Sequence, residues 1–213
     1  MQTWTIVVAA GSGARFGGAK QFETLGPERL VDRAVLSASR CSDGVVLVLP
    51  PGTRWDGPPV EAAVAGGATR AASVRAGLEA VPATADVILV HDAARPLAGD
   101  DLFALVTGAV TAGADGAVPA IAVTDTVKRV DGGRVVATLA RDDLVTVQTP
   151  QAFRGSVLRR AHAGLDDGTD DAALVEAAGG HVVVVAGEPT NVKVTGPADL
   201  ALVRALLAAR TGA

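Results

Sequence analysis

The feature that most constrains this chain is a glycine-rich loop directly after its first apolar run. Residues 5–10 are apolar and β-rich, as in a buried parallel strand. The loop that follows holds Gly11, Gly13, Gly17 and Gly18. Glycine has no Cβ, so the backbone N–H groups of such a loop can approach an anion closely. Arg15 and Lys20 bring positive charge to the same place, and the loop therefore predicts a site for nucleotide phosphates.

Two better-known phosphate loops do not fit the spacing. The dinucleotide-binding fingerprint requires G-x-G-x-x-G, but here the third glycine, Gly17, comes one position late. The P-loop requires glycine before its lysine and serine or threonine after it, whereas Lys20 follows alanine and precedes glutamine. A Rossmann dehydrogenase is therefore disfavoured. The loop by itself leaves a simpler alternative, a glycine-rich turn with Arg15 and Lys20 as solvated charges.

Length and composition narrow the class of protein. A chain of 213 residues, 49% of them apolar, can bury a large core, and we expect residues 1–213 to form a single domain. The net charge of −4 argues against a nucleic-acid partner, and no apolar run approaches the roughly 20 residues of a membrane span. The N-terminal residues do not resemble a secretion signal, so we expect a cytoplasmic protein with no membrane partner. Cys41 is the only cysteine, which excludes internal disulfides and cysteine-based metal clusters.

Lysine is rare in this chain, and its positions are informative. Among 19 basic residues only Lys20, Lys128 and Lys193 are lysines. A coding bias toward arginine would explain the rarity, but it would scatter the remaining lysines at random. Each instead lies in a segment that looks functional on other grounds. The compact charge of lysine suits phosphate contact where the planar arginine fork does not fit.

Apolar strands alternate along the chain with segments of helical periodicity. We predict strands at 5–10, 44–49, 60–65, 86–90 and 181–186, and helices at 30–40, 69–81, 100–112, 155–163, from 171 to the glycines at 179–180, and from 197 onward. This order indicates an α/β fold, a Rossmann-like, doubly wound, mainly parallel sheet with helices on both faces. Such sheets bind ligands at the carboxyl ends of their strands. The polar segments 11–20, 66–73 and 92–95 all fall there.

The segment 121–141 departs from this alternation. Residues 123–130 and 134–139 flank an Asp-Gly-Gly turn and predict a protruding β-hairpin arm. A two-stranded hairpin alone is marginally stable in water, so it must pack against something. We expect a homodimer in which the arm packs against a second copy of the chain. The alternative is a monomer whose hairpin folds back on its own sheet.

Several short motifs recur in a fixed order along the chain. They are A-A-G-x-G-x-R at 9–15, K-Q at 20–21, G-G-x-x-R-x-x-S-V at 66–74, V-H-D-A-A-R-P at 90–96, D-T at 125–126, T-P-Q at 149–151, T-D at 169–170 and N-V-K-V-T at 191–195. Together they resemble the 2-C-methyl-D-erythritol 4-phosphate cytidylyltransferases of the non-mevalonate isoprenoid pathway, over nearly the whole chain. The chain departs from the family pattern at Ala19, usually a proline, and at Ala72, often an acidic residue. Neither change removes a charged phosphate ligand.

The resemblance implies a nucleotidyltransferase fold and a cytidylyl transfer. In this family a phosphate oxygen of a sugar-alcohol phosphate attacks the α-phosphorus of CTP, and pyrophosphate leaves. Mg²⁺ or another divalent cation is bound to the triphosphate. The attacking phosphate is already an anion, so positioning and charge stabilisation matter more than a strong base. By the resemblance, Arg15 and Lys20 stabilise the charge that develops at the α-phosphate.

The resemblance also assigns the remaining site residues. The nucleotide would contact Ala9, Ala10, Gly11, Gly13, Gly66 and Ser73. The acceptor would contact Asp92, Arg95, Thr126 and Thr169, and its phosphate would be positioned by Arg141 and Lys193. Thr126 and Arg141 belong to the arm and would serve the site of the neighbouring subunit. Asp92 would hold acceptor hydroxyls or approach the metal, and the sequence does not separate these two uses.

Simpler roles are open for some of these residues and their neighbours. Asp92 could merely cap the turn after its strand, and His91 is expected to be structural. His162 and His181 are expected to be peripheral. The acidic pair 170–171 is expected to start a helix.

Two other functions compete with the main one. A ribitol 5-phosphate cytidylyltransferase would share most of these motifs and differ in its acceptor pocket. A nucleotide-sensing module would bind CTP without turnover and would release no pyrophosphate.

Overall fold

The protein is built around an eight-stranded sheet, described by a computed structural model that covers residues 1–11, 13, 16–164, 168 and 170–211. The strand order is β10-β7-β11-β6-β1-β4-β5, and β12 also pairs with β7. The strands are β1 (Thr3–Val8), β4 (Gly44–Leu49), β5 (Ala62–Ala65), β6 (Val87–Asp92), β7 (Gly116–Ala122), β10 (Val145–Val147), β11 (Gln151–Arg154) and β12 (Val182–Ala186).

Parallel pairs predominate in this sheet. β1 is parallel to β4 and β6, β4 to β5, and β7 to β12. β11 runs antiparallel between β6 and β7, and β10 is antiparallel to β7. All residues of β4 and β6 are buried, as expected for strands covered on both faces. The predicted α/β sheet is confirmed as a mixed, mostly parallel one.

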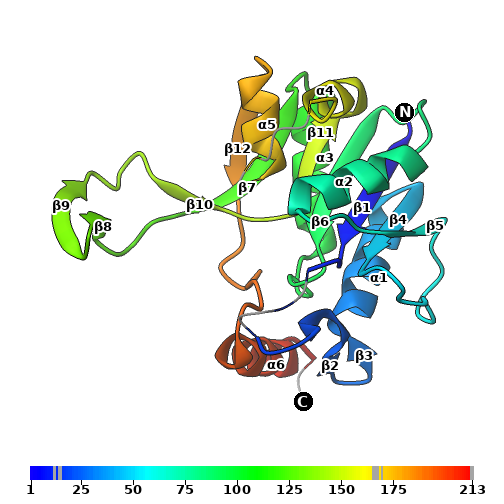
Figure 1. Ribbon diagram of the computed structural model, residues 1–213, viewed down its shortest axis with the longest axis horizontal. Helices are drawn as coiled ribbons and strands as arrows, with labels where there is room; N and C mark the ends of the chain where they lie inside the picture. The colour runs from blue at the N-terminus through cyan, green and yellow to red at the C-terminus, as the bar shows by residue number, and fades with distance from the viewer. Residues whose placement is uncertain (12, 14–15, 165–167, 169, 212–213) are drawn as a thin grey trace.

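Helices cover both faces of the sheet (Figure 1). They are α1 (Leu30–Cys41), α2 (Arg70–Ala80), α3 (Asp100–Thr111), α4 (Gly155–Ala161), α5 (Asp171–Ala177) and α6 (Pro197–Thr211). On one face, α1 and α3 bury Val35 and Phe103 against the sheet. On the other face, α2 and α4 bury Leu78 and Leu158. Among the residues described, no helix combines the length and the apolar character that crossing a bilayer requires.

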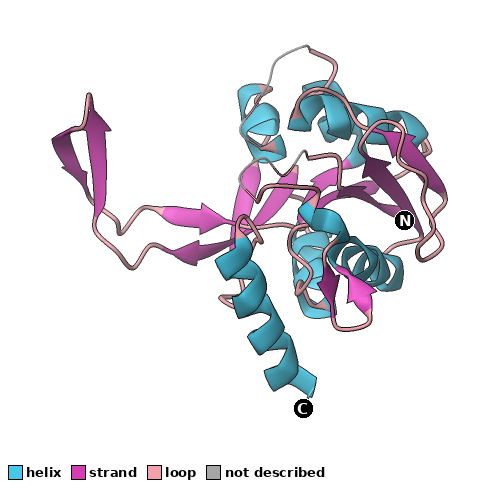
Figure 2. Ribbon diagram, turned by 60° about the horizontal axis from the view of Figure 1, so that its bottom comes forward, coloured by secondary structure: helices cyan, strands magenta, loops and turns pink. Residues whose placement is uncertain are grey.

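The helix α6 lies apart from these two layers, beside the short strands β2 (Thr24–Leu25) and β3 (Glu28–Arg29) (Figures 1 and 2). A third apolar cluster joins them, and it includes Leu25 and Leu200 together with Val194 from the segment before α6. This cluster therefore holds the end of the chain against the segment that follows the glycine-rich loop.

The predicted hairpin is present as β8 (Val127–Asp131) and β9 (Arg134–Leu139), which pair only with each other among the described strands. It stands away from the sheet at the end of two connections, residues 123–126 and 140–144 (Figures 1 and 2). It does not fold back on its own sheet, so that part of the monomer alternative is wrong, while the homodimer stays a prediction. Val130, Val135 and Val136 on the arm are 54%, 55% and 53% exposed.

β7 and β10 were not predicted from the sequence, although β7 pairs with β10, β11 and β12. Pro119 lies within β7. A proline in an apolar segment argues against a central strand, because it has no N–H to donate to the neighbouring strand. The carbonyl of Pro119 accepts from the backbone N–H of Gln148, which lies between β10 and β11. The proline thus lies opposite the break between these two strands, where the lack of an N–H is tolerated. Residues 121–122 accordingly belong to the sheet and not to the arm.

Candidate active site

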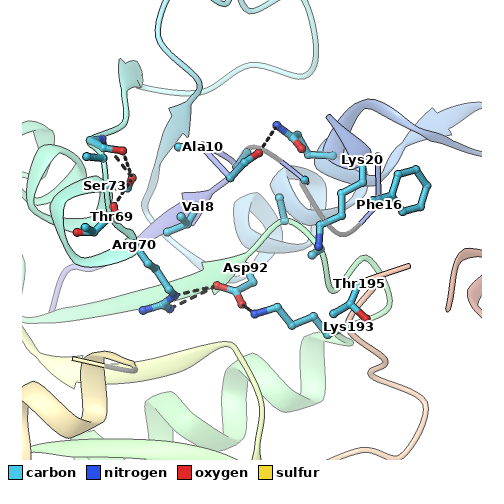
Figure 3. Close-up of a pocket in the computed structure, with 18 residues that line it drawn as sticks. Val8, Ala10, Phe16, Lys20, Thr69, Arg70, Ser73, Asp92, Lys193 and Thr195 are labelled. Atoms are coloured by element: carbon cyan, nitrogen blue, oxygen red, sulfur yellow. Dashed lines mark hydrogen bonds and ion pairs between the residues drawn. The ribbon is translucent and has the colours of Figure 1, made fainter. Parts of the chain in front are cut away.

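A pocket of about 610 Å³ opens where the carboxyl ends of β1 and β6 meet. Its described lining comes from four separate parts of the chain: the end of β1 with the glycine-rich loop (8–11, 13, 16, 20 and 21), the start of α2 (67–70 and 73), the end of β6 (92–94), and residues 193 and 195. The three polar segments that were predicted at this edge therefore do converge. Figure 3 shows their side chains facing one cavity.

The glycine-rich loop forms one wall of this pocket. Gly13 has a φ of +65°, and a Cβ at this position would lie 1.8 Å from the carbonyl oxygen of Gly18, so only glycine fits. The carbonyl of Gly13 accepts from the backbone N–H of Phe16 and of Gly17 at 2.8 and 3.0 Å, which folds the loop into a tight turn. A Cβ on Gly11 would meet nothing within 4 Å, so the backbone there is open to a ligand. Arg15 lies outside the described residues.

Lys20 joins this loop to the far end of the chain. Its Nζ donates to the carbonyl of Val194 at 2.6 Å, across 174 positions of sequence. Lys193, the residue before Val194, lines the same pocket (Figure 3). Two of the chain's lysines, which the sequence singled out, are therefore brought to one cavity.

Asp92 lies between two cations. Its Oδ2 accepts from Lys193 Nζ at 2.6 Å, and its Oδ1 accepts from Arg70 Nε at 3.3 Å (Figure 3). Burial alone would raise the pKa of the Asp92 carboxyl, but the positive charges of Arg70 and Lys193 outweigh it and hold this pKa far below its usual value. Asp92 is thus a carboxylate at any working pH. These contacts of the Asp92 side chain are ion pairs, and they differ from the simpler role considered from the sequence, a cap of the turn after β6.

A buried ion-pair chain extends from Asp92 behind the pocket. Arg70 Nη1 donates to Asp171 Oδ2 at 2.7 Å, and His162 Nε2 lies 3.1 Å from Asp171 Oδ1. Burial would lower the pKa of Arg70, but Asp171 and Asp92 raise it above its ordinary value, so the guanidinium stays charged. The expectation that His162 is peripheral is wrong, since the residue is 4% exposed. No role was predicted for Arg70, although the motif at 66–74 contains it.

Ser73, one of the predicted nucleotide contacts, lies on the opposite side of the pocket from Lys20 and Lys193 (Figure 3). Ser73 Oγ donates to the carbonyl of Thr69 at 2.9 Å and accepts from the N–H of Gly67 at 3.2 Å, so the start of α2 is fixed (Figure 3). A Cβ on Gly66 would lie 2.3 Å from Ala10 Cβ, which makes glycine necessary beside the end of β1. Ala9, Ala10 and Ser73 all line the cavity.

Other predicted site residues are placed differently. Arg95 donates through Nη1 to the carbonyl of Asn191 at 2.7 Å and through Nη2 to that of Val147 at 3.3 Å, beside the pocket. Thr126 and Arg141 flank the arm, and Arg141 donates to the carbonyl of Thr124. Both belong to the connections of the arm, which extend away from their own chain's pocket (Figure 1). Thr169 lies outside the described residues.

His91 is fully buried at the end of β6, with its ring against Phe103 at a centroid distance of 5.3 Å. Its Nδ1 lies 3.1 Å from Thr149 Oγ1. Burial lowers the pKa of His91 to about 4, and the negative charge of Asp92, which raises this pKa, offsets only part of that effect. The imidazole is therefore neutral at pH 7, which fits the structural role expected from sequence.

This pKa predicts how stability depends on pH. The pKa of His91 is about 6.5 in the unfolded chain and about 4 in the folded one. The neutral imidazole therefore contributes fully to stability above pH 6.5, and this contribution is lost as the pH falls toward 4, because the unfolded chain binds the proton more readily. When the pH is lowered from 7.5 to 5, the free energy of unfolding of the wild type should fall by about 2 kcal/mol more than that of a His91→Gln variant. Urea unfolding at the two pH values measures this difference. His162 and His181 are common to both proteins, and the pKa of Asp92 lies below this window. Equal losses in the two proteins would contradict the prediction.

Comparison with known proteins identifies the family. The sequence model of the family described as IspD, 2-C-methyl-D-erythritol 4-phosphate cytidylyltransferase, matches residues 3–209. The chain is 46% identical over 212 residues to the enzyme of that name from Rhodococcus jostii, with 95% of this chain and 93% of the relative covered. It is 45% identical over 225 residues to a bifunctional enzyme IspD/IspF from Solidesulfovibrio magneticus, covering 94% of this chain but 56% of that protein.

Solved structures agree with the sequence comparison. The crystal structure of 2-C-methyl-D-erythritol 4-phosphate cytidylyltransferase from Thermus thermophilus matches with a TM-score of 0.83 and 35% identity, over 97% of this chain and 99% of that one. The bifunctional IspDF from Campylobacter jejuni matches with a TM-score of 0.81 and 28% identity, over 95% of this chain and 54% of that one. The chain thus spans about half the length of these bifunctional relatives and nearly all of the monofunctional ones. This chain belongs to the 2-C-methyl-D-erythritol 4-phosphate cytidylyltransferase family.

Proposed function

We propose that this chain joins CTP to 2-C-methyl-D-erythritol 4-phosphate, giving 4-diphosphocytidyl-2-C-methyl-D-erythritol and pyrophosphate. The observation that carries the proposal is the meeting of Lys20 and Lys193 at one pocket that is lined by a glycine-rich loop. Such a pocket offers backbone amides and cations to a triphosphate and to a second phosphate at the same time. Family membership supplies the identity of the two substrates.

The reaction needs one bond to form and one to break. A phosphate oxygen of the acceptor forms a bond to the α-phosphorus of CTP, and the bond from this phosphorus to the oxygen that bridges to the β-phosphate breaks. The electron pair leaves on pyrophosphate, and no proton has to be removed from the attacking oxygen. Positioning and electrostatic stabilisation therefore supply the catalysis.

The nucleotide is assigned to the wall formed by the glycine-rich loop and the start of α2. Backbone groups at Gly11 and Gly13 face the triphosphate, while Gly66 and Ser73 face the cytosine. Ala9 and Ala10 complete the wall at the end of β1. Lys20, together with Arg15, stabilises the negative charge that builds on the α-phosphate. The lining of the pocket supports the roles of Ala9, Ala10, Gly11, Gly13, Lys20 and Ser73, and the open space beside Gly11 supports a close approach of the triphosphate there. The roles of Gly66 and Arg15 rest on the family pattern.

The acceptor is assigned to the side of the pocket where Asp92 and Lys193 lie. The Lys193 side chain is 39% exposed, so its ammonium group can turn from Asp92 to an incoming phosphate. Asp92, released in part from that pair, would accept hydrogen bonds from acceptor hydroxyls. Thr169 and Arg95 are proposed as further acceptor contacts on the basis of the family pattern.

Magnesium fits this site as an ion that arrives with the triphosphate. Among the described residues no group of three or more His, Cys, Asp or Glu side chains forms a metal cluster. Mg²⁺ in nucleotide enzymes is bound through one or two carboxylates together with substrate phosphates. Asp92 is ionised and lines the pocket, so it is the residue that would hold the ion. When bound, Mg²⁺ would neutralise part of the triphosphate charge.

We further propose that the arm of one subunit completes the site of its partner in a homodimer. The exposed valines of β8 and β9 support this proposal, because an isolated two-stranded hairpin is only marginally stable in water. Thr126 and Arg141 would then reach the acceptor in the neighbouring pocket. Arg141 and the Lys193 of that pocket would both contact the acceptor phosphate. The position of the arm, far from its own pocket, agrees with such an exchange.

The acceptor assay tests the proposed function directly. Enzyme, CTP and Mg²⁺ are incubated with 2-C-methyl-D-erythritol 4-phosphate or with ribitol 5-phosphate, and pyrophosphate release is measured. We expect release with the first acceptor and a kcat/KM for the second that is lower by about tenfold or more, since a pocket that hydrogen-bonds one set of hydroxyls discriminates against another. Faster turnover of ribitol 5-phosphate would make the chain the sister enzyme. Tight CTP binding without pyrophosphate release from either acceptor would indicate a sensing module.

A further inference from the structure

Asn191, in the segment that leads to Lys193, is fully buried but has no role in the proposed reaction. Its Nδ2 donates to the carbonyl of Thr149 at 2.9 Å, across 42 positions of sequence. Thr149 is also buried, and its Oγ1 accepts from the backbone N–H of Asp92 at 3.0 Å. Thr149 therefore contacts Asn191 on one side and Asp92 on the other.

These contacts close a ring. The backbone N–H of Asp92 is bonded to the side chain of Thr149, and the carbonyl of Thr149 is bonded to the Asn191 amide. Asn191 is linked through the backbone to Lys193, and Lys193 Nζ donates to Asp92 Oδ2 at 2.6 Å, which completes the ring. The Lys193 side chain is the exposed part of the ring. The hydrogen bonds of Thr149 with Asp92 and with Asn191 are buried, and buried hydrogen bonds hold a fixed geometry because breaking one leaves a polar group unpaired.

Further contacts hold the backbone on both sides of Lys193. Gln148 Oε1 accepts from the N–H of Glu188 at 3.0 Å and lies 3.4 Å from Asn191 Nδ2, while its Nε2 donates to the carbonyl of Glu188 at 2.8 Å. Arg95 Nη1 donates to the carbonyl of Asn191 at 2.7 Å. On the other side of Lys193, the N–H of Val194 donates to the carbonyl of Ala94 at 2.8 Å. Lys193 thus stands between two fixed points.

We infer that Asn191 is a positioning residue, which holds the backbone of Lys193 at the distance from Asp92 that the acceptor phosphate requires. The inference rests on the proposed function, because it gives Asn191 a role only through Lys193. Misplacing a catalytic group by about 1 Å costs on the order of 10²-fold in rate. Loss of the Asn191 amide should therefore reduce turnover of the acceptor without a matching loss of CTP binding, since the start of α2, to which the cytosine is assigned, lies on the other side of the pocket (Figure 3).

A double-mutant cycle on the full chain tests the inference. Asn191→Ala, Lys193→Ala and the double variant are compared with wild type for kcat/KM toward 2-C-methyl-D-erythritol 4-phosphate. CTP affinity is measured by calorimetry. We expect Asn191→Ala to lower kcat/KM about 10- to 100-fold while CTP affinity changes less than about threefold. In the Lys193→Ala background the same change should cost less than about threefold, because the group it positions is already gone.

The outcomes separate the inference from the proposed function. If the fold-losses of kcat/KM in the two single variants multiply in the double variant, Asn191 acts independently of Lys193. That result would overturn the inference while leaving the proposed function intact. A Lys193→Ala variant with near wild-type activity would remove the role of Lys193 and the inference with it.

A neighbouring residue provides the matched control. Thr190 lies beside Asn191, but its Oγ1 accepts from Arg210 of α6, so Thr190→Ala should keep wild-type kcat/KM. If Asn191→Ala does not fold, Asn191→Ser, which still shortens the side chain away from Thr149, takes its place in the same cycle.

Discussion

Replacing Lys20 with alanine should lower kcat by about 10²–10³-fold, the usual cost of removing one preorganised donor to a developing negative charge. The Lys20 ammonium lies at the glycine-rich loop and is already held in place by the carbonyl of Val194. A donor that is fixed before the reaction stabilises the transition state without a reorganisation cost. We therefore expect kcat to fall further than CTP affinity does, because ground-state binding is shared with the amides of the loop.

The measurement is steady-state kinetics with a coupled pyrophosphate assay, together with CTP calorimetry. Arg154→Ala is the matched control, since Arg154 is a half-exposed cation paired with Asp115 and lies beside Val87 at the amino end of β6, the opposite edge of the sheet from the pocket. That variant should stay within about threefold of wild type, as solvated surface charges contribute little. A loss below about tenfold for Lys20→Ala, and likewise for Arg15→Ala, would remove the proposed catalytic role of these cations.

The edge of the sheet that carries the pocket was predictable because the relevant signals are local. An apolar run followed by glycines and a lysine needs only neighbouring residues to be recognised, and the loop with Lys20 lies at the pocket as predicted. Alternation of strands and helices likewise predicts a mainly parallel sheet through short-range periodicity. Because the carboxyl ends of parallel strands lie at the same edge of a sheet, Asp92, at the end of β6, is predicted to lie near the loop.

Contacts between distant residues were out of reach of the same reasoning. Arg70 and Asp171 are 101 positions apart, and nothing in the sequence pairs that arginine with that acid. The contact between Asn191 and Thr149 depends on how the segment after β12 lies against the link between β10 and β11, and β10 itself was not predicted. His162 was judged peripheral for the same reason, because its burial comes from α5 packing against α4. Tertiary packing, which local periodicity does not encode, decides all of these.

The position of the arm was predictable, but its exchange between subunits is a separate proposal with its own sharp test. A subunit that carries Arg141→Ala keeps its own Lys20, and a subunit that carries Lys20→Ala keeps its own Arg141. If the arm of each subunit serves its partner's pocket, a heterodimer of the two has one pocket with both residues intact and one with neither. Each variant alone should be nearly inactive, whereas the mixed dimer should be active at one of its two sites.

Random reassembly of equal amounts of the two variants makes about half of the dimers mixed, so about a quarter of the wild-type activity should return. The recovery, measured as pyrophosphate release after the two proteins are unfolded and refolded together, would be about tenfold or more above either variant refolded alone, since each lacks a charge-stabilising donor in every pocket. Refolding Lys20→Ala together with a Lys20→Ala, Arg141→Ala double variant is the matched control, because no pairing of these chains gives an intact pocket. If Arg141 instead acted in its own subunit, every pocket of the first mixture would lack one residue, and mixing two well-folded variants would restore nothing. Absence of recovery would therefore contradict the exchanged arm while leaving the assignment of Lys20 untouched.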